Sequence, residues 1–285
     1  MYIKNLLSQQ FKWSPTPQQE QVFELLANFL HTFSKDSCFI LKGYAGTGKT
    51  TIISALVQSL PRINKKSVLL APTGRAAKVM SSYSGRRALT IHKKIYRKKS
   101  ATSLQMDFSI AENLHEETLF IVDEASMIST EGFSFHSDGL LSDLIRYVQS
   151  GKNCTLMLVG DTAQLPPVGL DYSPALDIGY INAEYGLEVF RYEMTDVVRQ
   201  DKGSGILFNA TKIRNEIKLD EESPEYTFPK FITQGYRDVF RMTGDRLIEG
   251  LHYAYDKYGI ENCMVICRSN KSANLYNKHI RNQIL

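Results

Sequence analysis

The chain has 285 residues, a length that corresponds to roughly two domains and that can bury a sizeable core without disulfides or a structural metal. Hydrophobic residues make up 43% of it and charged residues 22%, an ordinary globular composition that excludes an intrinsically disordered chain. No apolar run reaches the length of about 18 residues that a transmembrane helix needs, so we expect no membrane partner. The N-terminal residues also lack the apolar core of a secretory signal.

The charges are unevenly distributed along the chain. Lysine and arginine number 34 and acidic residues 30, for a net charge of +4. No Asp or Glu occurs between Ser37 and Met106, a stretch with 14 lysines and arginines, whereas the remaining 215 residues carry 20 basic and 30 acidic side chains. This asymmetry indicates a polyanionic partner, with a solvated basic face as the alternative interpretation.

The four cysteines each lie within an apolar run: Cys38, Cys154, Cys263 and Cys267. We expect them to be small buried residues in strands. No Cys-x-x-Cys pair occurs and no histidine stands at ligand spacing, which makes a zinc site improbable. The pattern indicates a reduced, cytoplasmic chain.

Apolar residues recur at helical and strand spacings along the first 160 residues. In chain order we expect a helix over 17–33, a strand over 38–41, a helix over 49–60, a strand over 67–71, a helix over 74–83, a strand over 119–122, a helix over 140–148 and a strand over 155–159. Strands that alternate with helices predict an α/β fold with a parallel sheet covered on both faces.

The alternation restarts after residue 195. We expect a helix over 237–258, a strand over 264–267 and a helix over 270–281. The sequence therefore predicts a first domain over 1–195, with a short insertion near 97–116, and an incomplete second domain over 196–285.

The segment Gly43–Thr50, GYAGTGKT, fits the pattern GxxxxGK[ST] between an expected strand and an expected helix. This is the context of a P-loop, whose backbone N–H groups and helix N-terminus bind phosphate. Lys49 is expected to reach the terminal phosphates, and the Thr50 hydroxyl to bind Mg²⁺. The predicted ATP-binding residues of this loop are Gly43, Ala45, Gly46, Thr47, Gly48, Lys49, Thr50 and Thr51. An accidental Gly-rich turn is the alternative.

Two further strands end in polar residues that suit phosphate hydrolysis. Asp123 and Glu124 follow the apolar strand 119–122, and Gln164 follows the strand 155–159. Ligands of open α/β sheets lie beyond this end of the strands. Asp123 is expected to hold Mg²⁺, Glu124 to take a proton from the attacking water, and Gln164 to orient water or sense the γ-phosphate. A helix cap is the alternative for the acidic pair.

The stretch from Arg86 to Lys99 interleaves basic residues with an aromatic residue. Lys93 and its neighbours are expected to track the phosphates of a nucleic acid, and Tyr96 to stack on a base.

Together these strings resemble superfamily 1 helicases, in particular the 5′→3′ group with RecD-like, Dda-like and Pif1-like enzymes. The resemblance rests on GYAGTGKTT (43–51), APTGRAAKVM (71–80), TIHKKIY (90–96), IVDEASMI (121–128), GDTAQLPPVG (160–169), TDVVRQ (195–200) and NKSANLYNKHIRNQI (270–284). It implies a RecA-like P-loop ATPase domain, followed by the beginning of a second RecA-like domain. It also implies ATP and Mg²⁺ as cofactors, and single-stranded DNA or duplex junctions as partners.

The resemblance also implies roles for individual residues. Gln19 matches the glutamine that binds adenine, with Gln18 as a competitor for that role. Thr73 and Arg75 lie in a motif that grips a DNA phosphate, although Thr73 is also a good helix cap. Thr90 and His92 match a motif on the nucleic-acid side, with an ordinary surface histidine as the alternative for His92.

The resemblance implies further roles for Gln164, for Arg199 and for the insertion. Gln164 matches the residue that links the γ-phosphate to the DNA side. Arg199 matches an arginine finger, with a surface ion pair to Asp196 or Asp201 as the alternative. The insertion at Ser100–His115 occupies the place of a hairpin that splits duplex in the related enzymes.

The later motifs of the family do not occur in this sequence, which suggests a fragment with ATP and single-strand binding but little unwinding. We expect the parent to be an ATP-driven DNA helicase, located in the cytoplasm or on the nucleoid, with single-strand-binding or replication and repair proteins as possible partners. A nucleic-acid-binding ATPase switch or loader and a P-loop kinase are the alternatives. The position of Glu124 argues against the kinase, because a base that activates water is unhelpful there.

Overall fold

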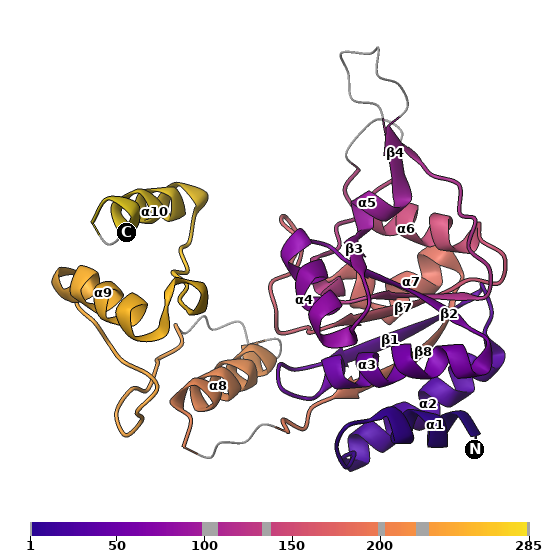
Figure 1. The fold of residues 1–285 in the computed structure, drawn as a ribbon, viewed down its shortest axis with the longest axis horizontal. Helices are drawn as coiled ribbons and strands as arrows, with labels where there is room; N and C mark the ends of the chain where they lie inside the picture. The colour runs from indigo at the N-terminus through magenta and orange to yellow at the C-terminus, as the bar shows by residue number, and fades with distance from the viewer. Residues whose placement is uncertain (1, 99–107, 133–137, 199–202, 221–227, 284–285) are drawn as a thin grey trace. The chain divides into compact units, whose positions relative to one another are not determined.

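The computed structural model describes residues 2–98, 108–132, 138–198, 203–220 and 228–283 (Figure 1). Its contacts divide the chain into unit 1, Met1–Gln200, and unit 2, Asp201–Leu285. None of the described helices combines the length and apolar character needed to cross a bilayer.

Unit 1 is built on a parallel sheet of six strands in the order β3-β2-β6-β7-β1-β8. The strands are β1 (Ser37–Gly43), β2 (Lys66–Ala71), β3 (Ala88–Thr90), β6 (Thr118–Val122), β7 (Thr155–Gly160) and β8 (Glu188–Met194). Every residue of β6 and β7 is buried, as expected for central strands covered on both faces. The predicted α/β P-loop architecture is confirmed, and β3 and β8 are edge strands that the sequence pattern did not reveal.

Helices cover both faces of this sheet (Figure 1). Successive residues of β1 alternate between two cores: Phe39 and Leu41 belong to one, and Cys38 and Ile40 to the other. The first core is closed by α1 (Tyr2–Gln10), α2 (Pro17–Thr32), α3 (Lys49–Ser59) and α4 (Gly74–Ser84). The second core is closed by α5 (Ile91–Ile95), α6 (Leu140–Gln149) and α7 (Ile178–Tyr185), with the short turns η2 (Ala125–Met127) and η3 (Pro174–Leu176).

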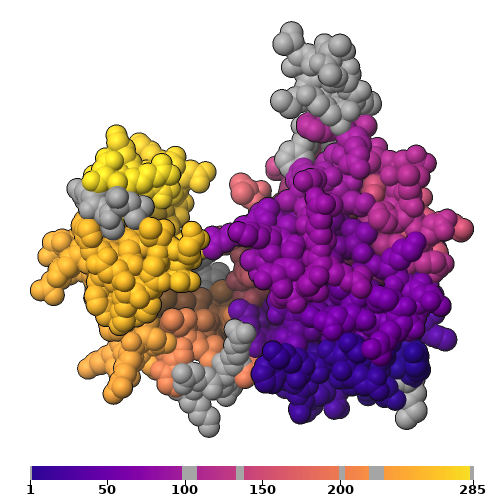
Figure 2. All heavy atoms as spheres, viewed as in Figure 1, coloured from indigo at the N-terminus to yellow at the C-terminus, as the bar shows by residue number. Residues whose placement is uncertain are grey.

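The start of α2 is fixed by its sequence. Thr16 accepts a hydrogen bond from the backbone N–H of Gln19, and the Gln19 side chain accepts one from the N–H of Thr16, which forms a capping box ahead of Pro17. The helix α1 was not predicted. It packs on α2 and α3, and the space-filling view shows this N-terminal segment, in indigo, flush against the purple body of unit 1 (Figure 2).

The insertion begins and ends in a short antiparallel pair. Strand β4 (Tyr96–Lys98) pairs with β5 (Phe108–Ile110). The part of the predicted insertion between them, 99–107, lies outside the described residues, so its role on duplex stays a prediction.

Unit 2 contains α8 (Gly205–Asp220), α9 (Leu247–Tyr258) and α10 (Asn270–Gln283), with the short turns η4 (Gly244–Arg246) and η5 (Ile260–Asn262). In unit 1 the short turn η1 (Leu60–Ile63) extends α3.

The predicted helix over 237–258 begins ten residues later than expected, at Leu247. The reason lies at Asp238, whose carboxylate accepts the backbone N–H of Gly205 (2.8 Å) and so caps α8 instead of continuing a helix.

The predicted strand over 264–267 is wrong. Within the described part of unit 2 this segment pairs with no other strand, and an extended segment without a partner leaves its backbone groups outside a ladder. Cys263 and Cys267 are accordingly half-buried, whereas Cys38 and Cys154 are buried as expected.

Candidate functional site

The polar residues singled out in the sequence follow the C-terminal ends of the parallel strands. The P-loop follows β1, Thr73 follows β2, Thr90 ends β3, Asp123 follows β6 and Gln164 follows β7. Parallel strands bring all these ends to one edge of the sheet, where open α/β folds bind their ligands. At this end of the sheet, β6 lies between β2 and β3 on one side and β7 and β1 on the other.

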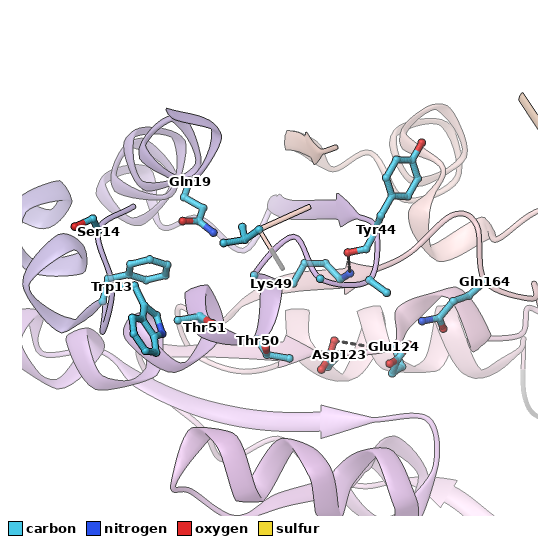
Figure 3. Close-up of a pocket in the computed structure, with 15 residues that line it drawn as sticks. Trp13, Ser14, Gln19, Tyr44, Lys49, Thr50, Thr51, Asp123, Glu124 and Gln164 are labelled. Atoms are coloured by element: carbon cyan, nitrogen blue, oxygen red, sulfur yellow. Dashed lines mark hydrogen bonds between the residues drawn. The ribbon is translucent and has the colours of Figure 1, made fainter. Parts of the chain in front are cut away.

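The P-loop adopts a conformation that its glycines require. Gly46 has φ +84° and Gly48 has φ +94°, in the left-handed region that favours glycine. A Cβ on Gly48 would lie 2.5 Å from the Gln19 amide nitrogen, so Gln19 would have to move, and the positive φ would strain any other residue there. The Lys49 Nζ donates to the backbone carbonyls of Gly43 and Tyr44, the latter at 3.0 Å (Figure 3).

A carboxylate that the sequence analysis did not single out braces this loop. The Asp161 side chain, 2% exposed, accepts the Ala45 backbone N–H at Oδ2 (3.0 Å) and the Ala163 N–H at Oδ1 (2.9 Å). It ties the end of β7 to the turn of the P-loop, a contact between residues 116 positions apart. The Gly-Asp pair at the end of a buried strand was the available signal.

Asp123 is held at both oxygens. Its Oδ1 accepts the backbone N–H of Glu124 (3.0 Å), and its Oδ2 accepts the hydroxyl of Tyr83 (2.8 Å), which comes from the last turn of α4. Burial, together with the charges of Asp123 and Glu124, raises the pKa of Tyr83, so this hydroxyl keeps its proton. No local sequence pattern indicates that Tyr83 has a carboxylate partner.

Glu124 has φ +55°, a left-handed backbone at the bend after β6. Burial and the neighbouring charge of Asp123 raise the pKa of its carboxyl group, while Lys49 and a hydrogen bond from Gln164 lower it. The balance is a raised pKa, which makes this carboxylate a stronger proton acceptor than an ordinary exposed glutamate.

Gln19 lies inside the site, 3% exposed. Its Oε1 accepts the Thr16 N–H (3.0 Å), and its Nε2 donates to the Thr47 carbonyl (3.1 Å), so the amide joins α2 to the P-loop. Gln18 instead bonds to the backbone and side chain of Thr195 and to the backbone of Asp196. Of the two candidates, Gln19 is the one that lines the pocket.

One cavity of about 440 Å³ joins these parts. It is lined by Phe11, Trp13, Ser14, Gln19, Tyr44, Ala45, Gly46, Gly48, Lys49, Thr50, Thr51, Asp123, Glu124, Gln164 and Val198. Figure 3 shows Trp13, Ser14 and Gln19 at one end, Lys49 and Thr50 in the middle, and Glu124 and Gln164 at the other end. Trp13 and Phe11 were not predicted as site residues, because no local sequence pattern indicates that α1 and α2 place them beside the P-loop.

Several residues predicted to contact nucleic acid also have structural roles. The Thr73 hydroxyl accepts the Ala76 N–H and caps α4, and the Thr90 hydroxyl accepts the Lys93 N–H and caps α5. Both caps lie where β2 and β3 end, beside exposed residues. A threonine that caps a helix at this end of the sheet can therefore also contact a phosphate.

The half-buried Tyr96 ring packs against the second core, and its hydroxyl donates to the buried Asp143 (2.7 Å), while its stacking on a base stays a prediction. The His92 ring lies 5.8 Å from that of Tyr96, and burial lowers its pKa. Lys93 and Arg75 are exposed. Arg199 lies outside the described residues, and its predicted role stays a prediction.

The donor set fits a nucleoside triphosphate with Mg²⁺. The P-loop offers a turn that a Cβ would fill, next to a lysine, while Thr50 and Asp123 supply the oxygen ligands that Mg²⁺ takes beside phosphates and water. Within the described ranges, no group of three or more His, Cys, Asp or Glu side chains is placed to hold a metal ion.

The comparison with protein families gives the assignment. A family model described as an AAA domain (AAA_19) matches residues 28–170. The chain belongs to this family. The matched residues contain the whole P-loop, Asp123, Glu124 and Gln164, whereas Trp13 and Gln19 lie before them.

This AAA-domain chain is related to ATP-dependent DNA helicases. It is 30% identical over 179 residues to "ATP-dependent DNA helicase dda" of Enterobacteria phage T4, which covers 61% of this chain and 37% of that protein. It is 30% identical over 160 residues to the "ATP-dependent RecD2 DNA helicase" of Deinococcus radiodurans, covering 54% and 19%. The chain thus spans well under half the length of these relatives, which confirm the resemblance to Dda-like and RecD-like enzymes.

Among solved structures, the Pif1 helicase from Candida albicans matches with a TM-score of 0.50 at 15% identity, covering 95% of this chain and 55% of that chain. This likeness supports the fold.

Proposed function

We propose that the chain is the ATP-hydrolysing part of a 5′→3′ DNA helicase, which binds ATP with Mg²⁺ in the P-loop cavity and single-stranded DNA along the β2–β3 side of the same edge. The observation that carries the proposal is the joint placement of Lys49, Thr50, Asp123, Glu124 and Gln164 around one cavity. Relatives named ATP-dependent DNA helicases support it.

The residues would divide the work as follows. Lys49 would leave its carbonyl partners and bind the terminal phosphates. Thr50 and Asp123 would hold Mg²⁺, which would neutralise charge that develops on the phosphoryl group. Glu124 accepts a proton from the attacking water, and Gln164, which lines the same end of the cavity (Figure 3), orients that water. Gln19 binds the base beside Trp13, and Arg199 completes the charge clamp.

The motor function is tested by hydrolysis and directional movement of the full-length parent protein, because this chain by itself is expected to unwind little. We expect oligothymidylate to stimulate its ATP hydrolysis, and ATP to drive displacement of streptavidin from the 3′ end of a biotinylated strand in preference to the 5′ end. Stimulated hydrolysis without displacement from either end would support the ATPase switch instead.

The base end of the cavity offers an aromatic surface. Trp13 is 65% exposed, lines the cavity opposite Glu124 and Gln164, and has Lys12 Nζ 5.3 Å from its ring centroid. Behind it Phe11 is buried and packs edge-on against Phe23, with ring centroids 5.2 Å apart, which anchors this segment on α2. A base stacked on Trp13 would lie close to Gln19, whose amide keeps one N–H and one lone pair beyond its described bonds.

We expect Trp13→Ala to weaken binding of ATP and ADP about tenfold, since stacking of a base on an aromatic ring contributes roughly 1–3 kcal/mol. Trp13 is the single tryptophan of the chain, so nucleotide binding should also change the intrinsic tryptophan fluorescence of the wild type. Tyr2→Ala, at an exposed aromatic residue of α1, is the matched control. Unchanged nucleotide affinity in Trp13→Ala would contradict the proposal that the base stacks on Trp13.

Strand binding should weaken with salt. About five phosphate contacts with single-stranded DNA imply a slope of roughly −3.5 in a plot of log affinity against log salt concentration. Lys93→Ala should reduce the slope by about 0.7. Lys152→Ala is the control, because Lys152 is exposed, pairs with Glu116 and precedes β7 at the opposite edge of the sheet. A flat salt response, measured by fluorescence anisotropy of a labelled oligonucleotide, would mean that the basic stretch is a solvated face.

A further inference from the structure

Helix α4 connects two parts of the site edge. It begins at Thr73, beside the exposed Arg75, and ends one residue after Tyr83. It is a single uninterrupted helix of 11 residues, so the rise of 1.5 Å per residue separates Thr73 from Tyr83 by about 15 Å. Because the backbone hydrogen bonds of such a helix are continuous, we expect a displacement of its first turn to move its last turn as well.

The last turn is attached to the metal-binding carboxylate. The Tyr83 hydroxyl donates to Asp123 Oδ2 at 2.8 Å, and the other oxygen of Asp123 accepts the Glu124 N–H. Tyr83 is half-buried against the first core, and Asp123 is buried, so neither side chain has many alternative rotamers. The orientation of the Asp123 carboxylate therefore depends on the position of α4. Each oxygen keeps a lone pair for Mg²⁺ or for its water ligands.

We propose that Tyr83 is a positioning residue that orients Asp123 for Mg²⁺ and makes Mg²⁺–nucleotide binding depend on strand binding at the start of α4. This inference rests on the proposed function, because it requires nucleotide with Mg²⁺ at Asp123 and a DNA strand at Thr73 and Arg75. Linkage is reciprocal, so nucleotide must change the affinity for the strand by the same factor as the strand changes the affinity for nucleotide.

The test compares the full wild-type chain with Tyr83→Phe, which removes only the hydroxyl. Binding of a fluorescent ADP analogue is titrated with Mg²⁺ in the absence of turnover. We expect the half-saturating Mg²⁺ concentration to rise about tenfold in Tyr83→Phe, as for the loss of a hydrogen-bond partner of a metal ligand, and nucleotide affinity to recover at high Mg²⁺. Tyr185→Phe is the matched control, because its hydroxyl bonds to Ser142 Oγ at 2.9 Å on the other face of the sheet.

The second measurement is the coupling between ligands. Affinity for oligothymidylate is measured with and without a non-hydrolysable ATP analogue and Mg²⁺. We expect a ratio of about five or more in the wild type and in Tyr185→Phe, and a ratio near one in Tyr83→Phe, with unchanged strand affinity in the absence of nucleotide. Tyr83→Met, which keeps an apolar side chain in the core, replaces Tyr83→Phe if the latter lacks a cooperative thermal transition.

The inference is overturned if Tyr83→Phe keeps the wild-type Mg²⁺ dependence and coupling ratio. It is also overturned if Tyr83→Phe and Tyr185→Phe lose affinity equally without recovery by Mg²⁺, because that result means a purely structural role. A wild type that binds Mg²⁺–ADP but hydrolyses no ATP contradicts the proposed function alone, since the Mg²⁺ titration of binding still measures the role of Tyr83.

Discussion

Replacing Lys49 with alanine should lower the affinity for ATP about 10- to 100-fold. The ammonium group bonds to the carbonyls of Gly43 and Tyr44 at the mouth of the P-loop, where it is positioned for terminal phosphates. A charge-assisted hydrogen bond contributes roughly 1.5–3 kcal/mol, and every 1.4 kcal/mol is tenfold in binding. Equilibrium binding of a fluorescent ATP analogue measures the loss.

The control for Lys49→Ala is Lys35→Ala, which removes the same charge from an exposed residue just before β1, at the opposite edge of the sheet. It should leave nucleotide affinity within about twofold of the wild type. An ATP affinity or ATPase rate in Lys49→Ala equal to that of the wild type would refute the phosphate site.

Glu124→Gln should separate binding from hydrolysis. The amide keeps the size of the side chain but accepts no proton, so we expect turnover to fall about 10²- to 10⁴-fold, the usual contribution of a general base. Nucleotide affinity should stay within about threefold. The measurements are steady-state ATP hydrolysis with oligothymidylate and binding of the same nucleotide, with Glu184→Gln on α7 as an exposed control.

The same substitution has a predictable effect on stability. The raised pKa of Glu124 means that the folded chain favours the protonated carboxyl group more than the unfolded chain does. The free energy of unfolding therefore falls as the pH rises through that pKa and the group ionises. Glu124→Gln should therefore melt at the same temperature as the wild type at neutral pH, or at a higher one. Normal turnover in this variant would exclude Glu124 as the base.

Local sequence predicted the parts of the site that local chemistry determines. The glycine spacing before Lys49 and the acids after an apolar strand are sufficient to place a phosphate loop and a carboxylate pair at one edge of a sheet. The bounds of α2 and α3 likewise follow from Thr16, Pro17 and Gly48, residues that start a helix or bend the chain ahead of one.

The remaining features depend on contacts between distant segments. The hydrogen bond from Tyr83 to Asp123 spans 40 residues, and that from Ala45 to Asp161 spans 116. Trp13 reaches the cavity only because α1 and α2 pack against the first core. Periodicity also overestimated unit 2, where the apolar run around Met264 has strand composition but pairs with no neighbouring strand in the described segments.

The hydrogen bonds of Lys49 have a consequence for the energetics of the nucleotide cycle. Since its ammonium group already bonds to two carbonyl oxygens of its own loop, an arriving phosphate replaces existing partners instead of meeting a bare charge. The net gain from this exchange is smaller than the full strength of the new bonds, while a departing phosphate leaves the lysine with partners ready to receive it. Such a loop would bind a nucleotide less tightly, and release it more readily, than a loop whose lysine lacks these carbonyl partners.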